Sequence, residues 1–258
     1  MVNSQDRTIF EELIRSFDQE KTSSEYPDQL LLKIGKFFLG TPYLAGSLEK
    51  TAEHLIVNLR ECDCVTFVEN VVALALLIES QQKSFHTFRK LLQKIRYRQG
   101  RLQGYSSRLH YFSDWIHDNQ RKGILRDITA EIGGRPFRKI LTFMTTHPDL
   151  YPPLRDAANL RRMKSLERTI SKRSLFFIPK KALRRLEDRI RNGDLVGITT
   201  NREGLDIEHV GIAVRVKNRI HLLHASSVMG KVILSKDTLH RYLTKSKTRS
   251  GLKLARVL

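Results

Sequence analysis

The 258-residue sequence is poor in the residues that cross-link or interrupt a chain: it holds 2 Cys, 7 Pro, 14 Gly and 1 Trp. Two cysteines are too few for a disulfide scaffold. The low Pro and Gly content, beside 40% hydrophobic residues, excludes collagen-like, low-complexity and wholly disordered chains. The longest purely apolar run, Val71–Ile78, falls far short of the roughly 20 residues that a membrane-spanning helix needs. The length suits one large domain, or two small ones, with a proper core.

Acidic residues are also scarce, since 27 Asp and Glu face 46 Lys and Arg and leave a formal charge of +19. Nucleic acid, an acidic membrane surface and an anionic polymer all attract such a chain. The excess is uneven: residues 83–101 carry seven bases and no acid, and residues 155–191 carry thirteen bases against four acids. Spaced apolar residues in both stretches predict amphipathic helices with basic outer faces. Because no zinc-finger spacing, Walker loop or RNA-binding aromatic signature accompanies the charge, a nucleic-acid role would rest on charge alone.

The hydropathy pattern changes along the chain from helical spacing to short β-rich runs. Helices are predicted at Leu30–Leu39, Val65–Ser80 and Tyr111–Gln120, and 154–191 is expected to be mainly helical, with Pro179 starting a helix. Strands are predicted at Ile128–Ile132, Ile140–Thr145, Asp194–Thr200, Val210–Val216, Arg219–Ala225, Lys231–Leu234 and Leu252–Val257. Helices first and an antiparallel sheet last indicate an α+β fold.

Both cysteines lie in the segment Glu61-Cys62-Asp63-Cys64. A disulfide between them would be strained, and a metal site would need more thiol or imidazole ligands than this segment offers. Asp63 is predicted to cap the helix that follows, which places Cys64 in the first turn. There the free N–H groups and the helix dipole favour a thiolate, and the Cys64 N–H can face a developing oxyanion. Cys64 is therefore the candidate nucleophile, and two inert buried thiols are the alternative.

Two of the nine histidines stand where they could serve a nucleophile. His209 opens one predicted strand, and His224 closes the next. A hairpin with Lys217-Asn218 at its tip would set the two imidazoles side by side, which suits a base and the group that orients it. His209 lies 145 residues after Cys64, a separation similar to that of papain-type enzymes.

Together these pieces resemble the NlpC-type cell-wall hydrolases, a branch of the papain-like cysteine peptidase fold. Their order, Tyr, Cys, His, His, is that of the family, whereas a circularly permuted acyltransferase branch places its His before its Cys. The matching pieces are Leu39-Gly40-Thr41-Pro42-Tyr43, Asp63-Cys64, His209-Val210-Gly211-Ile212 and His224-Ala225-Ser226.

Within that superfamily the chain looks most like a branch first catalogued as a domain of unknown function and linked to N-acetylmuramoyl-L-alanine amidase activity. The resemblance runs from about Leu30 to the C-terminus and departs at Cys62, where an apolar residue is expected. It implies one catalytic domain, 27–258, with a helical insertion at about 100–192, behind an acidic helical extension, 1–26. It also implies a catalytic Cys at the N-terminus of a buried helix packed on an antiparallel sheet. The specific pieces are Asp63-Cys64-Val65-Thr66-Phe67-Val68-Glu69, Ser107-Arg108-Leu109-His110-Tyr111-Phe112-Ser113-Asp114-Trp115 and Gly204-Leu205-Asp206-Ile207-Glu208-His209.

The activity that the resemblance implies is hydrolysis of an amide in murein. Cys64 attacks the carbonyl, His209 takes and later returns a proton, and His224 orients His209. The Cys64 N–H and the Tyr43 hydroxyl hold the oxyanion. The scissile bond of the amidase branch joins N-acetylmuramic acid to L-Ala. A stem-peptide endopeptidase that cuts after D-Glu is the first alternative, and a non-enzymatic polyanion-binding protein is the second.

The insertion supplies the candidate substrate contacts. Arg108 would clamp a stem-peptide carboxylate, and Tyr111 and Trp115 would offer flat faces to a sugar ring, unless both rings are helix core. Asp63 is read as a helix cap rather than a substrate contact. The remaining candidates for substrate binding are His110, Asp114 and Ser226.

The expected partners are muropeptides, with electrostatic association to an anionic cell envelope and no specific nucleic acid. We expect a monomer without metal or cofactor. Residues 1–10 show no charged start followed by an apolar core. The predicted location is therefore the periplasm or the exterior if a signal peptide has been removed, or else the cytoplasm, where murein fragments are recycled.

Overall fold

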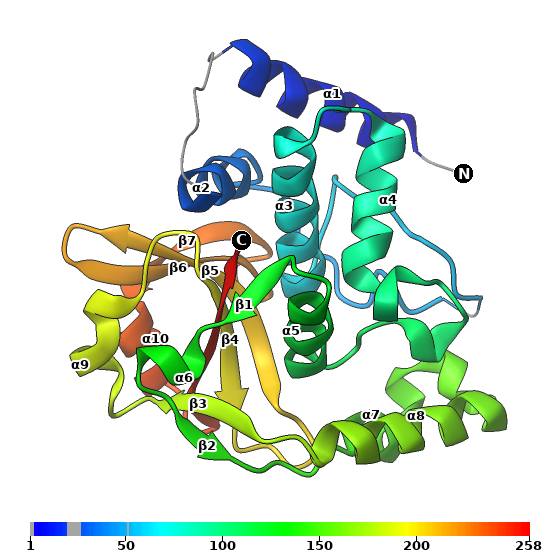
Figure 1. The fold of residues 1–258 in the computed structure, drawn as a ribbon, viewed down its shortest axis with the longest axis vertical. Helices are drawn as coiled ribbons and strands as arrows, with labels where there is room; N and C mark the ends of the chain where they lie inside the picture. Colours follow the sequence, from blue (N-terminus) through cyan, green and yellow to red (C-terminus); the bar gives the residue numbers. More distant parts are fainter. Residues whose placement is uncertain (1–2, 20–26, 51) are drawn as a thin grey trace.

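The computed structural model describes residues 3–19, 27–50 and 52–258 (Figure 1). The helices are α1 (Ser4–Gln19), α2 (Pro27–Phe37), α3 (Cys64–Glu79), α4 (Phe85–Arg96), α5 (Phe112–Arg121), α6 (Thr129–Ile132), α7 (Phe143–Thr146), α8 (Ala157–Ser171), α9 (Leu183–Leu186) and α10 (Leu239–Thr244). The strands are β1 (Leu125–Asp127), β2 (Arg135–Phe137), β3 (Leu175–Pro179), β4 (Leu195–Thr200), β5 (Ile207–Val216), β6 (Arg219–Ser226), β7 (Lys231–Thr238) and β8 (Arg249–Val257). Five single 3₁₀ turns join them at Arg98–Gly100, Tyr105–Ser107, Pro148–Leu150, Pro152–Arg155 and Glu187–Arg189.

One antiparallel sheet forms the centre of the molecule. Its strand order is β2-β3-β8-β4-β5-β6-β7, and β1 pairs with the end of β8. The hairpin between β5 and β6 turns at Lys217, whose φ of 53° lies in the left-handed region expected at such a tip. The five strands predicted in the last third of the chain are therefore confirmed, and the fold is α+β.

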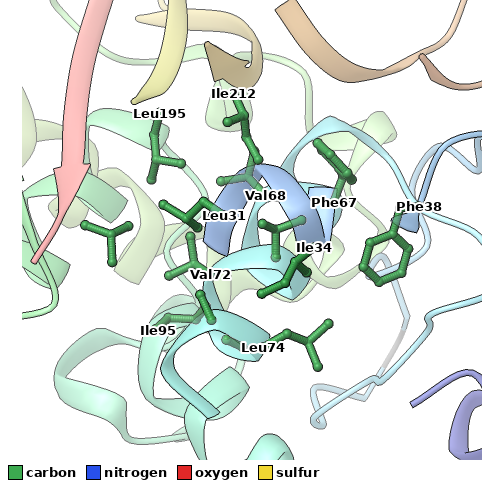
Figure 2. Close-up of a cluster of buried hydrophobic side chains, with 14 of the residues drawn as sticks. Leu31, Ile34, Phe38, Phe67, Val68, Val72, Leu74, Ile95, Leu195 and Ile212 are labelled. Atoms are coloured by element: carbon green, nitrogen blue, oxygen red, sulfur yellow. The ribbon is translucent and has the colours of Figure 1, made fainter. Parts of the chain in front are cut away.

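Helices α2 and α3 cover one face of this sheet. Every residue of α3 from Thr66 to Ala75 is buried, because the helix packs between α2, α4 and the sheet. Figure 2 shows this layer: Leu31 and Ile34 of α2 surround Val68 and Val72 of α3. The apolar helix predicted at Val65–Ser80 is thus confirmed as the centre of the core.

The other face of the sheet has a second, smaller core beneath α6, α9 and α10. Successive side chains along a strand point to opposite faces of the sheet and so contribute to both cores. Ile212 of β5 packs in the core on the α3 side, whereas Ala213 packs in the core on the α10 side. Within the described residues, no helix is long and apolar enough to cross a membrane.

Two predicted strands are wrong. Residues 129–132 form the helical turn α6, because Asp127 accepts a hydrogen bond from the Thr129 N–H (3.1 Å) and turns the chain out of β1. In the second predicted strand, Ile140–Thr145, Leu141 makes only a single bridge to Gly204, and the helix α7 begins at Phe143. Short apolar runs suit either structure, so only their tertiary surroundings decide.

The stretch 154–191 also differs from its prediction. It contains the helix α8, but Leu175–Pro179 is the strand β3, and Pro179 closes that strand opposite Gly251 instead of starting a helix. At the N-terminus the predicted acidic extension, 1–26, contains α1, while 1–2 and 20–26 lie outside the described residues.

Candidate active site

Cys64 is the first residue of α3, and the turn that holds it is fixed by a capping box. The Asp63 carboxylate accepts the Thr66 N–H (2.8 Å), and the Thr66 hydroxyl accepts the Asp63 N–H (2.9 Å). Reciprocal bonds of this kind satisfy two of the N–H groups that a helix N-terminus leaves open. The predicted cap is confirmed, and it leaves the Cys64 side chain at the helix start.

The surroundings of the Cys64 sulfur raise the pKa of the thiol to about 12. Burial is the largest cause and the Asp63 charge adds to it, while backbone hydrogen bonds from Val210, Cys64 and Val65 act in the opposite direction. The N–H groups of Cys64 and Val65 at the helix terminus favour a thiolate as expected, but desolvation outweighs them, so the thiol stays protonated in the resting protein. The sulfur nevertheless lies among backbone N–H groups, one of them the β5 amide next to His209.

His209 of β5 and His224 of β6 lie side by side, with 2.7 Å between His209 Nε2 and His224 Nδ1. The β5–β6 ladder ends at the pair Ile212 and Leu223, so the imidazoles meet where the strands part. Gly211 makes room for this contact, since a Cβ there would lie 2.9 Å from the Cβ of His224. The predicted pairing of the two histidines is thus the arrangement that the hairpin produces.

Both imidazoles are neutral at pH 7. The pKa of His209 falls to about 3, because burial disfavours the charged ring and His224 and Arg249 add to that effect. The pKa of His224 falls to about 4, through burial and then Arg249. A neutral imidazole retains the lone pair that a general base needs.

Tyr242 of α10 closes the side of this histidine pair. Its ring centroid lies 5.5 Å from that of His224 and 6.1 Å from that of His209. The guanidinium of Arg249 sits over the Tyr242 ring at 4.0 Å, donates to the Tyr242 carbonyl (2.6 Å) and also bonds Glu208 (3.2 Å). Nothing in the sequence pattern singles out Tyr242 or Arg249, because their position depends on α10 folding against the sheet.

Tyr43 lies near Cys64, on a segment fixed between β7 and the start of α3. Its N–H donates to the Gly230 carbonyl (2.9 Å), and the residue bridges Cys62. Burial, Cys64 and Asp63 together raise the pKa of the Tyr43 hydroxyl to about 12. The hydroxyl therefore stays protonated and can act as a hydrogen-bond donor near the thiol.

A cleft opens next to the first turn of α3. Its walls come from the loops before α3 and α5, from α7 and from the loop before β5. It is lined by Gly46, Leu48, Glu49, Asp63, Val65, Glu69, Arg108, Leu109, His110, Tyr111, Phe143, Met144, Tyr151 and Leu205. Three of the predicted substrate contacts, Arg108, His110 and Tyr111, therefore line a hollow beside the candidate nucleophile.

Each of these three side chains is already held by a protein partner. Arg108 pairs with Glu49 (2.9 Å) and lies 3.5 Å from Glu53. His110 Nε2 lies 2.9 Å from the Tyr105 carbonyl, and burial keeps its pKa well below 6.5. The Tyr111 hydroxyl donates to Glu167 of α8 (2.7 Å). These bonds fix the cleft wall in place, and with two carboxylates beside it Arg108 is not a free clamp for a third.

Asp114 and Trp115 lie outside the cleft. Trp115 is 0% exposed and stacks on Phe112 with ring centroids 5.0 Å apart, so its face is covered and cannot meet a sugar ring. Asp114 is buried and pairs with Arg98 and Arg173, each at 2.6 Å. The predicted substrate contact of Trp115 is therefore wrong, and the alternative of helix core holds for it.

The remaining predicted residues are Ser226 and the second cysteine. Ser226 ends β6, where its hydroxyl accepts the Met229 N–H (3.2 Å) and so braces the turn behind the histidines. Cys62 is 2% exposed, and burial raises its pKa to about 12. Among the described residues, no three His, Cys, Asp or Glu side chains cluster as a metal site would require.

Comparison with known proteins identifies related chains. A protein-family model described as N-acetylmuramoyl-L-alanine amidase-like (AmiA-like) matches residues 33–251. A solved N-acetylmuramoyl-L-alanine amidase from Bacteroides uniformis is 38% identical with a TM-score of 0.85, and the match covers 90% of this chain and 99% of that one. A Bacteroides fragilis protein with a provisional xylanase name is 41% identical (TM-score 0.82; 87% and 99% covered). A Legionella pneumophila protein of the DUF1460 family model is 26% identical (TM-score 0.72; 99% and 94% covered). A search of curated proteins found no match.

Proposed function

The chain belongs to the N-acetylmuramoyl-L-alanine amidase-like family, and we propose on that premise that it cleaves the amide between N-acetylmuramic acid and L-Ala in murein, with Cys64 as nucleophile. The sequence motifs pointed to this family, and the match confirms that prediction. One observation supports the assignment of the site above the others: the thiol of Cys64 accepts the backbone N–H of Val210, next to the His209–His224 pair.

The mechanism begins from a neutral thiol and a neutral imidazole. His209 accepts the thiol proton as the sulfur attacks the carbonyl carbon, and His224 holds the imidazole in place. The N–H groups around the sulfur and the Tyr43 hydroxyl stabilise the oxyanion. The imidazolium then protonates the leaving amine, the stem peptide departs with a free L-Ala amino group, and water hydrolyses the thioester.

The cleft beside α3 is the proposed substrate groove. It is lined by the fixed side chains of Arg108, His110 and Tyr111. The provisional xylanase name of the Bacteroides fragilis protein suggests a different chemistry, in which two carboxylates flank a glycosidic bond. The groups that surround the Cys64 sulfur are instead backbone N–H donors beside imidazoles, which suits acyl transfer.

A muropeptide digest followed by mass spectrometry tests the proposal. The protein is expected to release a sugar-free peptide that begins with L-Ala, whereas an endopeptidase would cut after D-Glu and leave the muramic acid linkage intact. Cys64→Ala is expected to abolish the release while the thermal unfolding midpoint stays close to that of the parent protein.

Cys62→Ala is the matched control, because Cys62 is buried two residues away and lies before the helix. It is expected to keep its turnover. If Cys64→Ala remains active, or if Cys62→Ala is the inactive variant, the nucleophile is wrongly assigned. If digestion of murein fragments is absent and the protein instead binds DNA with affinity that falls steeply with salt, it is the polyanion-binding alternative.

The proposed substrate also indicates where in the cell the protein would act. Murein lies outside the cytoplasmic membrane, so we propose a periplasmic or secreted monomer that acts on muropeptides without metal or cofactor. A cytoplasmic protein that recycles murein fragments is the alternative. Fractionation of cells that produce the full chain separates the two.

A further inference from the structure

Among the described residues, one buried nitrogen of the histidine pair makes no hydrogen bond of normal geometry. His224 is 2% exposed, and its Nδ1 is engaged with His209 Nε2. Within the described part of the chain, the Nε2 atom of His224 forms no hydrogen bond of normal geometry. The Ala225 backbone raises the pKa of the ring slightly, and this is the smallest influence on it after burial and Arg249. A buried N–H or lone pair without a partner costs free energy, so the surroundings of this atom bear on the chemistry of the pair.

The direction of the shared hydrogen bond decides whether His209 can act as a base. If His209 donates from Nε2, its Nδ1 keeps a lone pair free to accept a proton from a thiol, and His224 carries its own proton on Nε2. If His224 donates instead, His209 carries its proton on Nδ1 and has no free lone pair. A neutral pair therefore has one productive and one unproductive arrangement of protons.

The Tyr242 ring lies close enough to His224 to favour one of these two proton arrangements over the other. It stands at 71° to the His224 ring with centroids 5.5 Å apart, and Arg249 and the α10 backbone hold it there. The face of an aromatic ring is negative, so it attracts an N–H and repels a nitrogen lone pair. A His224 Nε2–H against this face is stabilised, and a lone pair at the same place is not.

We propose that Tyr242 is a positioning residue: the face of its ring accepts the Nε2–H of His224 and thereby fixes the proton arrangement in which His209 can serve as the base. This inference deepens the proposed function and rests on it for the role of His209. It requires the ring of Tyr242 and not its hydroxyl. Arg249, stacked on Tyr242, keeps the ring in contact with the imidazole.

Nitrogen-15 NMR of the histidine-labelled, substrate-free protein tests the proton arrangement directly, without any use of activity. Both His209 and His224 are expected to carry their proton on Nε2, and the His224 N–H resonance is expected to be shifted upfield by the ring current of Tyr242. His224→Asn identifies the resonance. A proton on Nδ1 of either residue, or an unshifted His224 N–H, overturns the proposal.

Two variants of Tyr242 then separate ring from hydroxyl. Tyr242→Leu removes the ring and is expected to lose the upfield shift and to lower kcat about fivefold, the equivalent of one weak N–H···π bond, with KM unchanged. Tyr242→Phe restores the ring and is expected to restore both the shift and kcat. If Tyr242→Phe loses as much kcat as Tyr242→Leu, the hydroxyl is the active part and the proposal is wrong.

The controls keep this result apart from failure of the proposed function. If the parent protein does not cleave muropeptides at all, the catalytic assignment fails while the NMR result still reports on Tyr242. If the parent protein cleaves muropeptides and the His224 N–H is unshifted, only the role of Tyr242 fails. Thermal unfolding of Tyr242→Leu shows whether a loss of kcat reflects a damaged fold.

Discussion

At the scale of single residues, desolvation is the dominant effect at the site. The sequence alone predicts a Cys64 thiolate from the helix terminus, but burial raises the pKa of the thiol to about 12 and lowers that of His209 to about 3. A thiolate–imidazolium pair in the resting protein would require the reverse order. In the proposed mechanism the thiolate is therefore generated during attack, by proton transfer to a neutral imidazole, and is not present beforehand.

The pH dependence of activity should show this directly. Activity falls as pH drops through the pKa of His209, because a protonated imidazole cannot accept a proton. With that pKa at about 3 and the thiol near 12, we expect kcat/KM on muropeptides to stay level from about pH 5 to about pH 9. A rate that rises with a midpoint near 6.5 would show that burial does not depress the pKa as stated.

Arg249→Gln should move the acid limb of this profile. Arg249 and His224 both disfavour a charged His209, while Glu208 and Tyr242 hold Arg249 in place. Loss of the Arg249 charge raises the pKa of His209, so activity should disappear at a higher pH, by about one unit. Arg249→Lys keeps the charge and serves as the control. An unmoved limb in Arg249→Gln would remove Arg249 from the electrostatics of the site.

Residue types and order along the chain were enough to predict that Cys64 begins a buried helix and that His209 and His224 lie in contact. Trp115 shows the limit of that reasoning, because an aromatic residue in a segment predicted to bind substrate serves equally well as core, and only burial distinguishes the two. Tyr242 shows another limit, since a contact made by tertiary packing leaves no spacing in the sequence.

At the scale of elements, the five strands of the last third were predictable, whereas the apolar runs at 128–132 and 140–145 were assigned the wrong structure. The run Val210–Val216 alternates between two cores, which fixes its register and face. The short run at 128–132 is compatible with either a strand or a helix, and the hydrogen bond from the Thr129 N–H to the Asp127 side chain favours a helical turn. The capping residue Asp63 was predictable because its signal is local.

The cap of α3 should matter for both stability and activity. Asp63→Ala removes the bond to the Thr66 N–H and should lower the free energy of unfolding by about 1 kcal/mol. Because this turn also holds Cys64, muropeptide turnover should fall as well. Ser84→Ala removes the N-cap of α4, where the serine accepts the Thr87 N–H (3.1 Å), and should cost similar stability with turnover kept. If Asp63→Ala and Ser84→Ala show equal turnover, the cap of α3 has no particular role in holding Cys64.

The parting of β5 and β6 should depend on Gly211. An alanine Cβ there would lie 2.7 Å from the Leu223 carbonyl and 2.9 Å from the His224 Cβ, so the hairpin must shift. Gly211→Ala should destabilise the protein by about 1 to 3 kcal/mol in chemical unfolding and lower turnover further by moving His224 from His209.

Gly197→Ala is the control for Gly211→Ala in the same sheet. Its closest neighbour, at 2.7 Å, is the end of the flexible Ile207 side chain, which can move aside. Turnover in this variant should stay closer to that of the parent protein. If Gly211→Ala is as active as Gly197→Ala, the contact across Gly211 does not hold the imidazole pair.

At the scale of the whole molecule, part of the basic charge is internal. In the stretch 83–101, Arg96 pairs with the buried Glu69 (2.7 Å) and Arg98 pairs with Asp114. Helix α8 differs, since its four bases Arg161, Arg162, Lys164 and Arg168 are exposed, and within the described residues none of the four forms an ion pair. The same helix braces the cleft, because its Glu167 holds Tyr111. These exposed bases thus lie on the outer side of a helix whose buried side supports a wall of the proposed substrate groove.

That placement predicts a division between binding to the polymer and turnover of soluble fragments. Arg161→Gln with Arg162→Gln removes two charges from α8 and should weaken, in a salt-dependent way, the sedimentation of the protein with purified murein sacculi, while cleavage of small muropeptides is kept. The control is Arg184→Gln with Arg185→Gln on α9, an equal loss of exposed charge that lies well apart from α8 in Figure 1. Equal weakening in both variants would mean that total charge, and not the face beside the cleft, attracts the polymer.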